Sequence, residues 1–251
     1  MKKKIEALHE VAKKNFRKEN FRELNGSFLK NLSELISIDK TVFFPYGYGL
    51  WNAKQNTKSS ILVLGQDFGN ECSWLVANAK GEKEQPTLRG LQNMMFEVAG
   101  IKDKSILNEC FFTNCFIGLR DIGYPITGPL RNYFKEVGIE KFWDNYIKQS
   151  EIFLDEQLKG INPEKILILG LEPALFLSRK NKIEECLQIE KGKTKVLESM
   201  MRVKNLRIEN RKLFLIPHPS NWNRYKSINE KNGNGEVINL VSEILLECFK
   251  K

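Results

Sequence analysis

The chain has 251 residues, enough to bury a sizeable core as one large α/β domain or as two small ones. Its 40 basic and 31 acidic residues give a net charge of +9, which favours a polyanionic partner, although a composition rich in Lys and Asn gives the same basicity without one. Five scattered cysteines without a Cys-x-x-Cys pair argue against a disulfide framework and against a zinc site. No apolar run approaches transmembrane length, so we expect a soluble cytoplasmic protein without a membrane partner.

The N-terminal region predicts two helices, over about residues 3–16 and 28–36, because apolar residues recur there at helical spacing. We expect residues 1–40 to form a helical extension packed on the core, and residues 41–251 to form one domain. Between the two parts, residues 42–51 place aromatic side chains among glycines and a proline, which is typical of a loop. This loop either lines a site or anchors itself in the core.

Four apolar runs predict buried strands and alternate with helical patterns along the rest of the chain. The expected helices cover about residues 88–98, 129–137, 142–158 and 174–178, and a last helix begins at Glu236. Residues 183–208 are poorly patterned and should contain a helix and a short strand. The alternation predicts an α/β fold, a three-layer α/β/α sandwich around a mostly parallel four-stranded sheet. The four runs are Ile61–Gly65, Cys110–Asn114, Lys165–Gly170 and Lys212–Ser220, the last ending in polar groups.

Polar side chains follow three of these strands, at the point where each strand ends. Gln66 and Asp67 come directly after the first, Asn114 ends the second, and His218 follows the last between two prolines. Ligands of open α/β sheets bind beyond the carboxyl ends of the strands, so these groups are candidate site residues. Each also has a structural reading. Asp67 is a suitable helix N-cap, Asn114 can satisfy loop backbone, and an isolated histidine is more often structural.

Two further stretches carry candidate contacts to phosphate groups. Thr87 is positioned to cap the helix that begins near residue 88, and with Arg89 beside it this helix start can hold a phosphate. Trp222 lies between two asparagines, a polar setting that predicts an exposed side chain in contact with a partner. Arg224, close behind, is either another such contact or a solvated surface charge.

Taken in order, these pieces resemble the motifs of the uracil-DNA glycosylase superfamily. The resemblance runs from about Phe43 to Lys251 and leaves the N-terminal helices outside it. Each piece alone is a weak signal, but four in the family's order, each at a strand end or helix start, are fairly specific. They are Gly65-Gln66-Asp67-Phe68-Gly69, Gln85-Pro86-Thr87-Leu88-Arg89, Thr113-Asn114 and His218-Pro219-Ser220-Asn221-Trp222.

The resemblance implies a role for each matching residue. Asp67 would orient the attacking water and face the sugar cation, His218 would hydrogen-bond O2 of the departing base, and Asn114 would read the N3 and O4 edge of a pyrimidine. The chemistry agrees, because cleavage of a glycosidic bond leaves positive charge on the sugar and negative charge on the base. The remaining base-binding candidates are Gln66, Phe68, Gly69 and Trp74. The DNA-binding candidates are Thr87, Arg89, Ser220, Arg224 and Trp222, the last as a wedge that fills the gap left by the flipped nucleotide.

Three departures from the family pattern affect specificity. Gly69 stands where the most uracil-selective members carry a tyrosine that blocks the thymine methyl group, so the pocket should admit 5-substituted pyrimidines. Phe68 replaces the usual proline. The loop Gly170–Pro173 lacks a Gly-Ser pair that pinches DNA in some members. Trp74 is the candidate for the aromatic residue that stacks on the base, and it is equally compatible with a place in the core.

Three functions remain open at this stage. The first is a monofunctional DNA glycosylase, expected to be monomeric and to need no cofactor, acting on uracil or a modified pyrimidine in duplex or single-stranded DNA. The second is a non-catalytic binder of damaged, modified or single-stranded DNA. The third is a small-molecule α/β enzyme that processes nucleotides.

Overall fold

The fold is that of a computed structural model, which describes part of the chain. The described residues are 6–8, 10–11, 14, 58–67, 86–116, 129–138, 140–180, 200–201, 203–204, 206–231 and 235–250. The second predicted N-terminal helix and the aromatic loop at residues 42–51 lie outside them. So do three candidate site residues, Phe68, Gly69 and Trp74.

The chain divides into two compact units. The first comprises Met1–Lys58, Gln66–Glu82 and Phe111–Asn162, and the second comprises Ser59–Gly65, Lys83–Cys110 and Pro163–Lys251. Neither unit follows the predicted division at residue 40, which stays a prediction.

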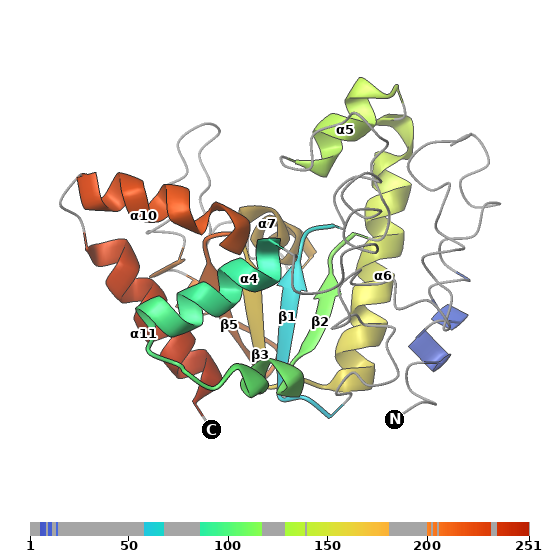
Figure 1. Cartoon of the computed structure of the whole chain (residues 1–251). Helices are drawn as coiled ribbons and strands as arrows, with labels where there is room; N and C mark the ends of the chain where they lie inside the picture. The colour runs from blue at the N-terminus through green and yellow to red at the C-terminus, as the bar shows by residue number, and fades with distance from the viewer. Residues whose placement is uncertain are drawn as a thin grey trace, which may run out of the picture. The chain divides into compact units, whose positions relative to one another are not determined.

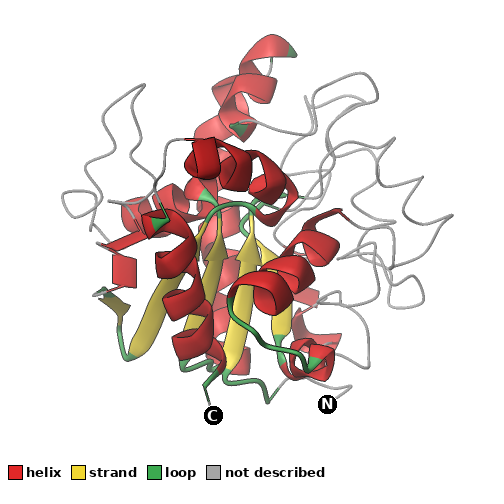
Figure 2. Cartoon of the chain, turned by 60° about the vertical axis from the view of Figure 1, so that its left-hand side comes forward, coloured by secondary structure: helices red, strands yellow, loops and turns green. Residues whose placement is uncertain are grey.

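The strands form a five-stranded sheet in the order β2-β1-β3-β5-β4. Strand β3 pairs in parallel with both β1 and β5, so the carboxyl ends of these three strands lie at the same edge. Helices flank the sheet, which confirms the predicted α/β class (Figures 1 and 2). The strand bounds are β1 Ile61–Gly65, β2 Phe111–Asn114, β3 Lys165–Leu169, β4 Arg207–Ile208 and β5 Arg211–Ile216.

The predicted strand count of four is wrong because β4 adds a fifth strand. This two-residue strand pairs antiparallel with β5, with Arg207 opposite Lys212 and Ile208 opposite Arg211. The turn between them places Glu209 in the left-handed region, at φ 54°. Glu is not a residue that signals such a turn, so the hairpin is hard to read from the sequence. The short strand falls in the stretch where one was expected.

Strands β1, β3 and β5 are buried along almost their whole length, as their apolar runs predict. In the second unit, α4 and α11 lie in front of these strands and α7 behind them (Figure 1). The helices of this unit are α4 Pro86–Asn93, the π-helical turn η3 Met94–Val98, the 3-10 helix η4 Lys104–Glu109, α7 Leu171–Lys180, the 3-10 helix η6 Pro219–Asn221, α10 Trp222–Lys231 and α11 Glu236–Phe249.

The first unit contains β2, α5 Leu130–Glu136, the 3-10 helix η5 Glu140–Phe142 and α6 Trp143–Ile161. Helix α6 is capped by Asn162, whose N–H bonds the carbonyl of Leu158 at 2.8 Å and whose left-handed backbone (φ 53°) then turns the chain out of the helix. An aromatic cluster joins the helices, with the rings of Phe134 and Trp143 5.2 Å apart at near-perpendicular planes. Other members among the described residues are Phe116, Tyr133 and Tyr146.

The described N-terminal residues are helical, as predicted for residues 3–16. Leu8 is buried, and it lies 3.9 Å from the position a Cβ would take at Gly160 of α6. Among the described residues, no helix combines the length and the apolar character needed to cross a bilayer.

Candidate functional site

His218 follows the end of β5 by two residues, between Pro217 and Pro219. It caps the N-terminus of η6 with its side chain, and its Nδ1 lies 2.8 Å from Oγ of Ser220. The backbone N–H of Ser220 also points at Nδ1, at 3.4 Å. Because a backbone N–H can only donate, Nδ1 acts as an acceptor. In the tautomer that this contact favours, the neutral imidazole carries its proton on Nε2.

Gly170, directly after β3, allows the His218 side chain to approach the backbone. Its φ of +90° is disfavoured for residues with a Cβ, and its N–H bonds the carbonyl of Ile216 at 2.9 Å. A Cβ at Gly170 would lie 3.2 Å from Cβ and 3.6 Å from Cδ2 of His218. The end of β3 thus supports the histidine from one side. From the sequence, Gly170 was read only as a strand end.

Helix α4 packs against η6 at a second glycine. A Cβ at Gly90 would lie 2.3 Å from the carbonyl oxygen of Pro219 and 2.6 Å from its carbonyl carbon. Real Cβ atoms do not approach backbone atoms this closely, so the contact requires glycine. Gly90 was not singled out in the sequence, because its pattern shows only an isolated glycine in a helix.

The same helix carries the two residues expected to hold a phosphate. Helix α4 begins at Pro86, so Thr87 is its second residue and the prediction of an N-cap is wrong. Proline is favoured in the first turn of a helix, which explains the earlier start. Thr87 is half-buried, and Arg89 is exposed and forms no ion pair with any residue that the structure describes. Ser220, on η6, is exposed as well.

The prediction of an exposed Trp222 is wrong. Trp222 begins α10 and is 2% exposed, with no hydrogen bond from Nε1 to a described residue. Its polar neighbours suggested a loop, but they start a helix, and a helix can bury one side chain while the adjacent ones face solvent. Asn221 and Asn223 are indeed exposed. In this conformation Trp222 is not placed to act as a wedge in DNA. The backbone of Arg224 lies in α10, and its side chain falls outside the described residues.

In the first unit, Gln66 and Asp67 follow β1 and are half-buried. The side-chain amide of Gln66 donates to Oδ2 of Asp67 at 3.3 Å, and the backbone carbonyl oxygen of Gln66 accepts from the N–H of Phe116 at 2.9 Å. The Gln66 backbone is therefore fixed, and its side chain holds the Asp67 carboxylate from one side.

Asn114 ends β2 and is 3% exposed. Its neighbour Thr113 donates its hydroxyl to Oε1 of Gln157 on α6, at 2.5 Å. The Asn114 amide, in contrast, makes no side-chain hydrogen bond within the part of the chain that the structure describes. A side-chain amide both donates and accepts, so this group is suited to a ligand edge that does the same.

The strands that precede the two proposed catalytic residues both pair with β3, and the residues themselves belong to different units. Leu64 of β1 pairs with Ile168 of β3, and Leu169 of β3 pairs with Ile216 of β5. Asp67 comes two residues after the end of β1, and His218 two residues after the end of β5. Both therefore follow strands whose carboxyl ends share one edge of the sheet.

No group of three or more His, Cys, Asp or Glu side chains able to hold a metal is found among the described residues. Compared with family models and with curated proteins, the chain matches none of them. The resemblance to uracil-DNA glycosylases therefore depends on the sequence motifs alone.

Proposed function

We propose that this chain is a monofunctional DNA glycosylase that hydrolyses the N-glycosidic bond of a flipped-out uracil or 5-substituted pyrimidine and leaves an abasic site. The observation that carries the proposal is the state of His218. Its Nδ1 accepts from the backbone N–H of Ser220, which favours the tautomer with the proton on Nε2. Donation of a hydrogen bond from Nε2 to a departing base requires a proton on that nitrogen.

In the proposed reaction the bond between C1′ and the base nitrogen breaks, and its electron pair leaves with the base. His218 Nε2–H stabilises the negative charge that develops on the pyrimidine oxygen. The Asp67 carboxylate, held by the Gln66 amide, stabilises the positive charge on the sugar and orients the water whose oxygen bonds to C1′. The proton that the water loses balances the one that the base nitrogen gains.

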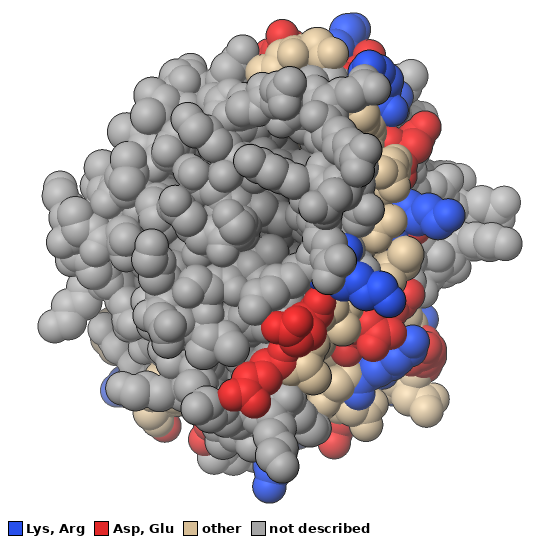
Figure 3. All heavy atoms as spheres, turned by 90° about the vertical axis from the view of Figure 1, so that its right-hand side faces the viewer, with Lys and Arg blue, Asp and Glu red and all other residues tan. Residues whose placement is uncertain are grey.

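DNA is expected to contact Thr87, Arg89, Ser220 and Arg224. Thr87 and Arg89 lie in the first turn of α4, where backbone N–H groups also favour a phosphate, and this helix packs directly on η6 with Ser220. Trp222 is left out of the proposal because its side chain is buried. In the described part of the face drawn in Figure 3, acidic and basic side chains are intermingled.

The test compares Asp67→Asn and His218→Ala with the unaltered protein on oligonucleotides that carry uracil, thymine mismatches or bulky 5-modified cytosines. Loss of a preorganised electrostatic group typically lowers the rate by about 10²- to 10³-fold. We expect each variant to release base more slowly by about that factor while DNA binding is kept. His9→Ala, at the only other histidine, is the matched control.

Full activity in both variants would contradict the mechanism. If the unaltered protein binds DNA in a salt-sensitive way but leaves no abasic site with any base, the chain is a binder without catalysis. Turnover of mononucleotides instead of DNA would identify a small-molecule enzyme. Restriction to uracil would refute the open pocket inferred from Gly69.

A further inference from the structure

A pocket of ≈ 270 Å³ opens near the amino-terminal end of β5, between that strand and the C-terminal end of α11. It is lined by Lys204, Leu206, Arg207, Lys212 and Glu247. Lys212 is the second residue of β5, whereas His218 follows the last. The pocket therefore lies at the edge of the sheet opposite to the strand ends discussed above, and the proposed reaction does not use it. All its residues belong to the second unit.

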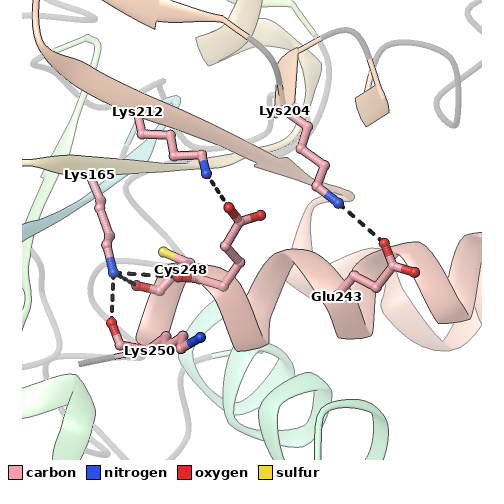
Figure 4. A network of polar contacts seen from close by, with 7 residues as sticks. Lys165, Lys204, Lys212, Glu243, Cys248 and Lys250 are labelled. Carbon is pink, nitrogen blue, oxygen red and sulfur yellow. Dashed lines mark hydrogen bonds and ion pairs between the residues drawn. The ribbon is translucent and has the colours of Figure 1, made fainter.

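Positive charge exceeds negative charge around this pocket. Lys212 forms an ion pair with Glu247, and Lys204 forms one with Glu243 at 3.2 Å (Figure 4). Arg207 is exposed and has no ion-pair partner among the described residues. Among the described residues of the lining, three are cations and one is a carboxylate, and the guanidinium of Arg207 pairs with none of them.

The pKa of Glu247, the carboxylate that lines the pocket, reflects the same excess of positive charge. The hydrogen bond from Lys212 lowers the pKa of Glu247, and the charges of Lys212, Lys204 and Lys165 lower it further. Lys165, on the neighbouring strand, donates to the carbonyls of Cys248 and Lys250 at 2.9 and 2.8 Å (Figure 4). Its charge stays close to the pocket and adds to the positive potential.

We propose that this pocket binds the phosphate group of a small anion, such as a nucleoside monophosphate. The planar guanidinium of Arg207 can bind two phosphate oxygens at once, and Lys204 can add a third contact. The ion pairs of Lys204 and Lys212 are partly exposed, with side chains 31 to 63% accessible, so they are weak and a phosphate can compete for the lysines. The volume is just below the roughly 300 to 1,000 Å³ of typical ligand pockets, which favours a small ligand.

The test measures binding to the full chain by calorimetry at low ionic strength. The probes are inorganic phosphate, a nucleoside 5′-monophosphate and a short single-stranded oligonucleotide. We expect saturable binding of the first two and a loss of roughly tenfold or more in Arg207→Ala, as removal of a charged hydrogen-bonding partner predicts. Arg207→Lys keeps the positive charge but loses the planar guanidinium. Its affinity for the two small ligands should lie between those of the unaltered protein and Arg207→Ala. Arg131→Ala is the matched control, because Arg131 is an exposed arginine on α5, outside the pocket.

A second variant probes the carboxylate. Glu247→Gln releases Lys212 and removes a negative charge, so both small ligands should bind more tightly. The proposal is overturned if neither small ligand binds saturably, or if Arg207→Ala binds them as well as the unaltered protein does. It is also overturned if only the oligonucleotide binds and its binding is lost in Arg207→Ala. None of these outcomes depends on base release, so the test is independent of the proposed glycosylase activity.

Discussion

At the scale of single residues, two glycines determine where His218 lies. Gly170 supports the imidazole from the end of β3, and Gly90 lets α4 touch the carbonyl of Pro219, the next residue along the chain. Prolines on both sides of His218 restrict the backbone further. These close approaches add to the contact between the His218 side chain and Ser220.

Gly90→Ala should destabilise the protein. Replacing glycine by alanine inside a helix ordinarily stabilises it by up to about 1 kcal/mol. Here the added Cβ would stand 2.3 Å from a backbone oxygen, so α4 or η6 must shift, and overpacking of this kind costs about 1 to 3 kcal/mol. Urea denaturation gives the difference in the free energy of unfolding.

Gly160→Ala is the matched control for Gly90→Ala. Gly160 also lies in a helix, and its nearest neighbour would be Leu8 Cδ2 at 3.9 Å, an ordinary contact. This variant should be neutral or slightly more stable. Equal effects of the two substitutions would show that the contact with Pro219 is not tight.

Single residues also show where sequence reasoning stops. The order of the motifs along the chain pointed to His218 as a site residue. Which ring nitrogen carries its proton is inferred only from the 3.4 Å contact between Nδ1 and the Ser220 N–H. Trp222 was misread because polar neighbours say nothing about which side of a short helix faces the core. Gly90 gave no signal, because a close approach between helix and turn depends on their distance in space and not on local pattern.

At the scale of elements, the C-terminal end of α11 compensates a repulsion within the sheet. Lys165 of β3 lies directly opposite Lys212 of β5, and like charges in such cross-strand pairs are destabilising. Helix α11 makes two contacts that offset this repulsion. Glu247 pairs with Lys212, and the last carbonyls of the helix accept from Lys165. Both contacts place cations at a helix C-terminus, where the helix dipole favours them.

Lys165→Met should loosen this helix end. The variant keeps the apolar stem and loses the donors to the carbonyls of Cys248 and Lys250. Hydrogen bonds from a charged donor contribute about 1.5 to 3 kcal/mol, and the relief of repulsion from Lys212 offsets part of this. We expect a net loss of about 1 kcal/mol and faster amide exchange in the last turn of α11.

Lys148→Met serves as control, because Lys148 is an exposed lysine in the middle of α6. It should leave the free energy of unfolding nearly unchanged. Exchange rates in α11 that are equal in the two variants would contradict the anchoring role of Lys165.

The elements were easier to predict than the contacts between them. The stripe beginning at Glu236 predicted α11, and its members Val241, Ile244 and Leu245 are buried. Periodicity identifies such a helix because one face must leave water. It could not separate α4 from the π-helical turn at Met94–Val98, since both patterns bury nearly the same residues. Nor did it reveal α10, where the apolar stripe is short.

At the scale of the whole molecule, buried thiols connect folding to pH. Cys110, Cys115 and Cys248 are free and buried. Burial raises the pKa of the Cys248 thiol from 9.0 to about 12, and burial, with the nearby Cys248, raises the pKa of Cys110 as well. The folded state therefore holds protons that the unfolded chain releases. Between these pKa values the folded protein binds more protons, so its stability falls as the pH rises.

The thiols should therefore leave the free energy of unfolding unchanged below pH 9 and lower it between pH 9 and about 12. For Cys248 alone, the free energy of unfolding falls by about 2 kcal/mol by about pH 10.5. Urea denaturation across this range, under reducing conditions, measures it. Lysine and tyrosine also titrate there, so the informative quantity is the difference between the unaltered protein and Cys248→Ala. The variant begins less stable because it leaves a small cavity, but its stability should fall less steeply with pH. If the free energy of unfolding falls equally steeply with pH in both proteins, the prediction is contradicted. The folded protein would then accommodate the Cys248 thiolate, because the end of α11 opens to water before the rest of the molecule unfolds.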